Sequence, residues 1–66
     1  MTIFEAIAST TADKPFIQSP RAAALDIKLK PVDGVDKCEV YFDGELINDN
    51  YQVKSLELKE QWAVVA

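Results

Sequence analysis

The side chains most able to do chemistry are carboxylates gathered in the middle of the chain. They are Asp33, Asp36, Glu39, Asp43, Glu45 and Asp49, and Lys37 is the only base among them. Three interpretations compete. The aspartates at 33, 43 and 49 suit turns, where a short acid bonds its own backbone. The same acids could form a surface that docks a basic partner or imitates nucleic acid. A calcium site is disfavoured, because the spacing of the EF-hand loop is absent.

Cys38 is the one cysteine, and the chain has no histidine. A disulfide within the chain is therefore impossible, and a zinc site lacks ligands. Cys38 alternates with Val40 and Phe42, so we expect it to point into the core as an inert thiol. Cys38 has no histidine to act as its base, so we do not expect it to be a nucleophile. The sequence predicts no catalytic residue, no metal ligand and no enzyme activity.

No cofactor motif is present. The two glycines, Gly34 and Gly44, each follow an aspartate as turn residues do, so no phosphate-cradling loop exists. The seven bases are spread along the chain and outnumbered by 11 acids, which gives a net charge of −4. Direct nucleic-acid binding is therefore not expected. No apolar stretch approaches the length of a membrane helix, so no membrane contact is expected.

Length and composition predict one small domain over 1–66. A 66-residue chain has a thin core, and the usual reinforcements are disulfides, metals or self-association. The hydrophobic fraction of 48% suits a folded domain. A single thiol and an N-terminus unlike a signal peptide indicate a reducing, cytoplasmic setting.

Residues 1–24 predict a short helix and an irregular excursion. Thr2 and Glu5 have the spacing of a capping box, which predicts a helix over 3–9 with apolar residues on one face. Residues 10–20 are expected to be irregular, with Phe16 and Ile17 turned inward. Ser19 and Pro20 then form a typical helix start, and 20–30 is interpreted as one helical turn followed by a strand, with a longer helix as the alternative.

Residues 25–66 predict an antiparallel sheet. Strict alternation from Leu25 to Lys30 predicts a strand, and Asp33-Gly34 predicts a two-residue hairpin turn that pairs Leu29 with Cys38. Asp43-Gly44 predicts a second such turn, which pairs Phe42 with Glu45 and Tyr41 with Leu46.

The last third of the chain is expected to complete the sheet. A third turn is expected at 48–50, which would pair Leu46 with Val53. Residues 51–58 then form a long strand, with a helix over 55–62 as the alternative, and 61–66 form the last strand. The fold class is α+β and β-rich: a short N-terminal helix and a four- or five-stranded antiparallel meander, either an open sheet or a small barrel.

These registers predict a candidate contact surface. Tyr41, Leu46 and Val53 would line up across three strands on the face opposite the core, and apolar patches on small proteins mark contacts. Alternatively, the N-terminal helix covers this face and the residues are simply core. Trp62 could join either arrangement. The acids Asp36, Glu39 and Glu45 complete the predicted partner-binding set.

Three function classes remain. The first is a non-enzymatic protein-binding module, such as a small regulator or inhibitor of a larger protein machine of the kind made by phages and mobile elements. The second is a structural or assembly subunit that forms a homo-oligomer through its strand edges. The third is an acidic nucleic-acid mimic that blocks a DNA- or RNA-binding protein.

Overall fold

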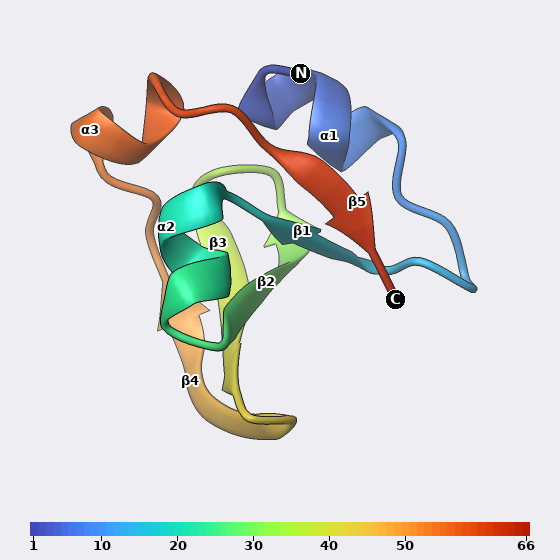
Figure 1. Cartoon of the computed structure of the whole chain (residues 1–66), viewed down its shortest axis with the longest axis vertical. Coiled ribbons are helices and arrows are strands. Elements are labelled where there is room, and N and C mark those ends of the chain that lie inside the picture. The colour runs from blue at the N-terminus through green and yellow to red at the C-terminus, as the bar shows by residue number, and fades with distance from the viewer.

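The computed structural model describes residues 1–66, which form three short helices and one five-stranded sheet (Figure 1). In chain order the elements are α1 (Ile3–Ala8), β1 (Phe16–Gln18), α2 (Pro20–Ala24), β2 (Ile27–Asp33), β3 (Lys37–Phe42), β4 (Glu45–Tyr51), α3 (Ser55–Leu58) and β5 (Ala63–Val65). The sheet is antiparallel and open, with the strand order β4-β3-β2-β1-β5. The predicted α+β, β-rich class is confirmed, and the open sheet is the correct one of the two architectures.

The helix at the N-terminus forms as its capping residues predict. Thr2 Oγ1 accepts a hydrogen bond from the Glu5 amide at 3.1 Å, and Glu5 Oε1 accepts one from the Thr2 amide at 2.8 Å. These bonds satisfy two amides that a helix start leaves free. A six-residue helix is too short to persist alone, so it is held by docking Ile3 and Ala6 in the core.

The segment expected to be irregular contains a strand, and this corrects the prediction for 10–20. β1 lies between β2 and β5, with Ile17 opposite Leu29 and Val64. Ile17 is fully buried, whereas Phe16 lies on the other face of the sheet, half-buried. Three residues are too few to show a period of two, so the alternation signal could not reveal this strand.

Ser19 and Pro20 begin α2 as predicted, and the strand that follows starts two residues later than expected. Leu25 ends the helix instead of starting β2. Asp26 then adopts a φ of +60°, a conformation that short polar residues tolerate better than others. The backbone reversal at Asp26 is what separates the helical turn from β2.

The first hairpin has a different register from the predicted one. Leu29 pairs with Val40, and Cys38 pairs with Pro31. The loop is longer than two residues, because Asp36 N donates to Asp33 O at 3.1 Å and the strand bulges between Pro31 and Asp33. A shift of two residues keeps every side chain on its predicted face, which is why alternation alone did not exclude it.

The second hairpin confirms its prediction near the turn. Asp43 and Gly44 have φ of 50° and 82°, and Phe42 pairs with Glu45 and Tyr41 with Leu46. Further along, a bulge places Val40 opposite Asn48.

The third turn, expected at 48–50, is wrong. β4 continues through these residues and brings Tyr51 opposite Cys38, so Leu46 does not pair with Val53. The Asx signal is real but local: Asn48 Oδ1 accepts from the Asn50 amide at 2.9 Å without reversing the chain.

The last part of the chain returns across the sheet. The expected strand over 51–58 is wrong, since Ser55–Leu58 form α3, in the region of the helical alternative. β5 then pairs with β1 at the edge of the sheet, so the meander covers β1 to β4 only. In Figure 1 the red β5 crosses beside α1, far from the orange β4 that precedes it in sequence.

The core lies on one face of the sheet, which we call the inner face. Its buried residues are Ile3, Ala6, Ile17, Leu29, Cys38, Val40 and Trp62. Helix α1 and the segment around Trp62 cover the part of this face near β1 and β5. The opposite, outer face carries Gln18, Lys28, Tyr41 and Leu46, by the pairing of the strands.

Candidate functional site

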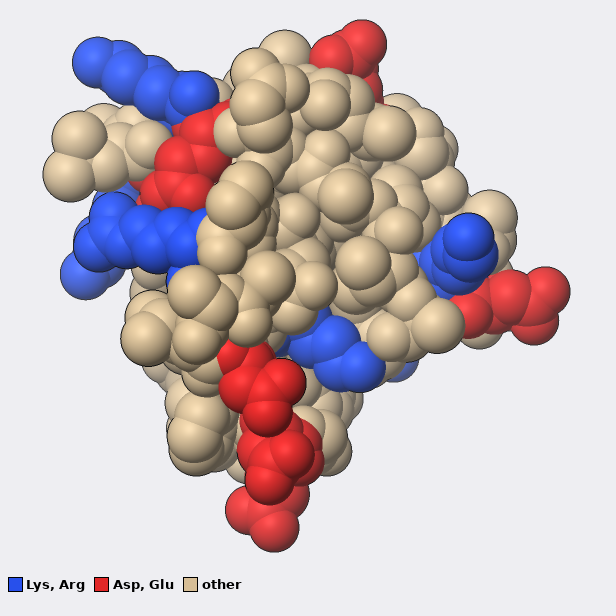
Figure 2. Space-filling model, in the orientation of Figure 1, with Lys and Arg blue, Asp and Glu red and all other residues tan.

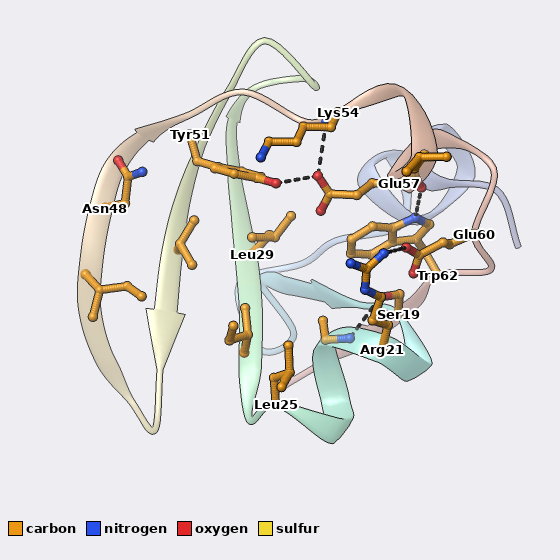
Figure 3. A pocket seen from close by; sticks show the side chains of 15 residues that line it. Ser19, Arg21, Leu25, Leu29, Asn48, Tyr51, Lys54, Glu57, Glu60 and Trp62 are labelled. Atoms are coloured by element: carbon orange, nitrogen blue, oxygen red, sulfur yellow. Dashed lines mark hydrogen bonds and ion pairs between the residues drawn. The ribbon is translucent and has the colours of Figure 1, made fainter.

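An apolar groove of about 400 Å³ opens on the inner face of the sheet, where no helix covers β2 and β3 (Figure 3). Its floor is formed by Ile27, Leu29 and Val40. One wall is α2, and the other is formed by β4 and α3. Pockets that bind ligands typically enclose 300–1,000 Å³ and are mostly apolar, so this groove has the size and lining of a binding site.

The rim of the groove exposes large apolar side chains to solvent. Leu25, Ile47 and Leu56 line it and are 57%, 58% and 70% exposed. Phe42 pairs with Ile27 on the same sheet face and is also exposed. Exposed apolar groups gathered around a concavity mark an interaction site more reliably than scattered ones do.

The wall formed by α2 is held by a buried cap. Ser19 is 3% exposed, and its Oγ accepts from the Ala22 amide at 3.1 Å. Pro20 occupies the first helical position, where its missing amide hydrogen is not needed. This short helix thereby presents Ala22 and Leu25 to the groove.

The wall formed by α3 is organised around Glu57. Its carboxylate accepts hydrogen bonds from the Tyr51 hydroxyl and from the Lys54 amide, the latter at 3.0 Å. Its backbone carbonyl accepts a bond from Trp62 Nε1 at 2.9 Å. Figure 3 shows these contacts converging on one side of the groove. One residue therefore fastens α3 to β4 and to the tryptophan of the core.

Burial, and then the hydrogen bond to the charged Glu57, raise the pKa of Tyr51 to about 12. The phenol therefore stays protonated near neutral pH and serves as a donor, and it does not act as a base.

The charges beside Trp62 balance one another. Arg21 Nη1 lies 3.8 Å from Glu60 Oε1, and Figure 3 shows this pair beside the indole ring. Lys54 and Glu57 add one further charge of each sign. The Trp62 ring itself is buried and lines the groove at this end.

Cys38 is fully buried, as predicted, and does not line the groove. Its Sγ donates to Gly34 O at 3.4 Å. Burial, with a smaller effect of the Glu57 charge, raises the pKa of the thiol. A thiol held in its neutral form and away from solvent is a weak nucleophile.

The structure keeps two of the three residues in the predicted contact surface together. Tyr41 and Leu46 pair on the outer face, where Tyr41 also packs edge-on against Phe16 with ring centroids 5.1 Å apart. Val53 does not join them. Its amide donates to Val35 O at 3.0 Å, and its side chain packs against the core. The alternative that α1 covers this outer face is also wrong, since Ile3 and Ala6 pack on the inner one.

The predicted acidic surface is divided between the two ends of the sheet. Asp36 lies in the turn between β2 and β3, whereas Glu45 lies beside the turn between β3 and β4. Glu39 is on the outer face between them and accepts a hydrogen bond from Tyr41 at 3.1 Å. No three acidic or thiol side chains converge as a metal site would require.

Three rim residues of the groove escaped the sequence interpretation. Leu25 was expected inside a strand, and Leu56 was assigned to a strand that is a helix. Ile47 follows Leu46 directly, and two adjacent residues of a strand face opposite sides, so one of the two had to lie on the inner face. Of the predicted partner-binding residues, only Trp62 lines the groove.

Comparison of the chain with protein-family models, with curated proteins and with solved structures finds no match. None of its helices has the length and apolar character needed to cross a bilayer.

Proposed function

We propose that this chain is a non-enzymatic protein-binding module whose groove receives apolar side chains of a partner. The observation that carries the proposal is the exposed rim of Leu25, Ile47 and Leu56 around an apolar floor that includes two core residues, Leu29 and Val40. A partner that covers this rim would remove apolar surface from water, which favours association by about 25 cal/mol for each Å² buried. Association of this kind is the form that a small regulator or inhibitor of a larger protein would use.

The polar groups of the groove favour a protein partner over a small substrate. Arg21 is engaged with Glu60, and Tyr51 with Glu57, so these groups are already paired. Specific small-molecule sites instead aim several free polar groups at one ligand. An apolar contact area with paired polar groups at its margin is the usual composition of a protein interface.

Self-association is a second candidate, and a specific observation favours it. β4 is an edge strand of seven residues, and β3 is its only neighbouring strand. Edge strands pair readily with other chains. The two bulges along β4 and its run of polar residues, Asn48 to Asn50, oppose such pairing. The acidic mimic is less favoured, because the acids occupy opposite ends of the sheet.

Two leucine variants test the proposal as a matched pair. Leu56→Asp places a charge on the groove rim, and Leu46→Asp places one on the outer face; both leucines are exposed in the free chain. Binding to a purified partner, once captured by the immobilised chain, should be lost in Leu56→Asp and retained in Leu46→Asp. Circular dichroism should show both variants folded.

The opposite outcome would relocate the site. Loss of binding in Leu46→Asp alone would assign the partner to the outer face beside Tyr41. A chain that forms only concentration-dependent oligomers, and no complex, would favour the assembly subunit.

A further inference from the structure

Three acids lie beyond the end of the groove that is away from Trp62, and none of them lines it. Asp26 lies between two lining residues, Leu25 and Ile27. The Asp43 amide donates to Asp26 O at 3.1 Å, and Glu45 pairs with Phe42 on the groove side of the sheet. We call Asp26, Asp43 and Glu45 the acidic tip. Figure 2 shows acidic side chains gathered at the lower tip of the molecule, where Figure 1 places the turn between β3 and β4.

The two ends of the groove therefore differ in charge. At the Trp62 end, Arg21 and Lys54 balance Glu57 and Glu60. The acidic tip has no base in an ion pair, since the one ion pair of the chain is Arg21 with Glu60. A partner that places cations at the tip end would gain Coulomb attraction, and one that places anions there would be repelled.

The walls of the groove also restrict the backbone of the occupant. The floor is the face of β2 and β3, which have strand neighbours on both sides, and the walls are side chains of α2, α3 and β4. Of the strands that line the groove, only β4 has a free edge, and its two bulges oppose regular pairing there. An extended segment laid there would lose water from its amides and carbonyls without gaining partners, whereas a helix satisfies its own.

We propose that the groove binds an amphipathic helix of a partner protein, with its apolar face on Leu25, Ile47 and Leu56 and basic side chains at the acidic tip. The inference rests on the groove being the binding site of the proposed function. A helical turn about 10 Å across and 5.4 Å high occupies about 400 Å³, so the groove of about 400 Å³ has the size of one turn of a helix.

Three synthetic peptides without tryptophan or tyrosine test the inference. All carry the same leucine face; the first has lysines on its polar face, the second has glutamates, and the third is the lysine peptide with a central proline. Trp62 is the only tryptophan of the chain and lines the groove, so its fluorescence reports binding. The lysine peptide should bind about tenfold more tightly than the glutamate peptide at low salt, as two or three surface charge pairs provide. The proline peptide should bind more weakly, because proline breaks the helix.

A double variant of the tip provides the control on charge. Asp43→Asn/Glu45→Gln should abolish the preference for the lysine peptide over the glutamate peptide and leave the apolar contribution to binding. Asp13→Asn/Asp36→Asn gives the same net charge and should keep the preference. Added salt should reduce the preference of the unmodified chain.

The possible failures are distinguishable. Equal binding of the lysine and glutamate peptides overturns the charge inference and leaves the groove as a site. If the proline peptide binds as tightly as the lysine peptide, the inference that the occupant of the groove is a helix is wrong. Peptides that bind equally well to Ile47→Asp bind elsewhere, which contradicts the groove as the site and with it the proposed function. Peptides that never change Trp62 fluorescence contradict the helix inference alone, and the Leu56→Asp and Leu46→Asp variants then decide the proposed function. A dimer in light scattering that no peptide displaces assigns the groove to a second copy of the chain.

Discussion

Glu57 shows how one side chain can position a whole wall of the groove. It joins β4 through the Tyr51 hydroxyl and caps α3 through the Lys54 amide, while its backbone holds the Trp62 indole. Hydrogen bonds to a charged acceptor are stronger than neutral ones, and the bond from the Tyr51 hydroxyl is partly buried. The neutral phenol is the form that this arrangement favours.

Stability should therefore depend on the ionisation of Tyr51. The pKa of a tyrosine is about 10 in an unfolded chain, whereas the fold raises that of Tyr51 to about 12. The stabilisation is fully present below pH 10 and is lost as the pH rises through 12. Tyr51→Phe should be less stable near neutral pH by about 1 kcal/mol, the net contribution of one hydrogen bond. Its free energy of unfolding should fall less than that of the unmodified chain between pH 10 and 12.

Tyr41→Phe provides the spectroscopic control. It leaves Tyr51 as the one tyrosine, since the chain has two. Ultraviolet absorbance of the tyrosinate should then titrate with a midpoint near 12. A midpoint near the ordinary value of about 10 would contradict the role assigned to Glu57.

At the scale of elements, two helix caps of the same chemistry have different consequences. Thr2 caps α1 on the surface, whereas Ser19 caps α2 and is buried beside the groove. Replacing either with alanine removes a bond to a helix amide and should cost about 1 kcal/mol of unfolding free energy. Only Ser19→Ala loosens a wall of the groove, so only this variant should also weaken peptide binding, measured by Trp62 fluorescence. Equal binding by Thr2→Ala and Ser19→Ala would show that α2 does not shape the site.

Elements with a local chemical signal could be predicted, and elements defined by distant contacts could not. The caps of α1 and α2 and the turn at Asp43-Gly44 depend on neighbours in sequence, and all three are present. β1 is a strand only because β2 and β5 lie on either side of it. The end of β4 was missed because polar residues resemble a turn, although they cost little in an edge strand that faces solvent.

The candidate site was less predictable than the fold for a related reason. A groove exists where covering elements stop, and the extent of α2 and α3 over the inner face depends on tertiary packing. Trp62 was singled out by residue type, and it does line the groove. Val53 was singled out through an expected turn at 48–50, where β4 instead continues to Tyr51. Single-residue slips and bulges change which side chains share a face. A site inferred from strand register is therefore assigned the wrong residues wherever the register is wrong.

At the scale of the whole molecule, charge is unevenly distributed. The net charge is −4, the only ion pair joins Arg21 and Glu60, and the acidic tip contains three acids. Like charges near one another repel, and salt screens this repulsion over a Debye length of about 10 Å at 0.1 M. The acidic tip should therefore cost stability in the free chain, a cost that a basic partner would relieve.

Salt titration of the unfolding transition tests this last expectation. Sodium chloride should raise the free energy of unfolding of the unmodified chain, by about 0.5–1 kcal/mol between low and moderate salt. Asp43→Asn/Glu45→Gln should remove most of this dependence. Asp13→Asn/Asp36→Asn should retain it, although both double variants change the net charge by the same amount. An identical loss in the two would show that total charge, rather than the tip, destabilises the fold, and would weaken the argument that the tip is kept acidic for a cationic helix.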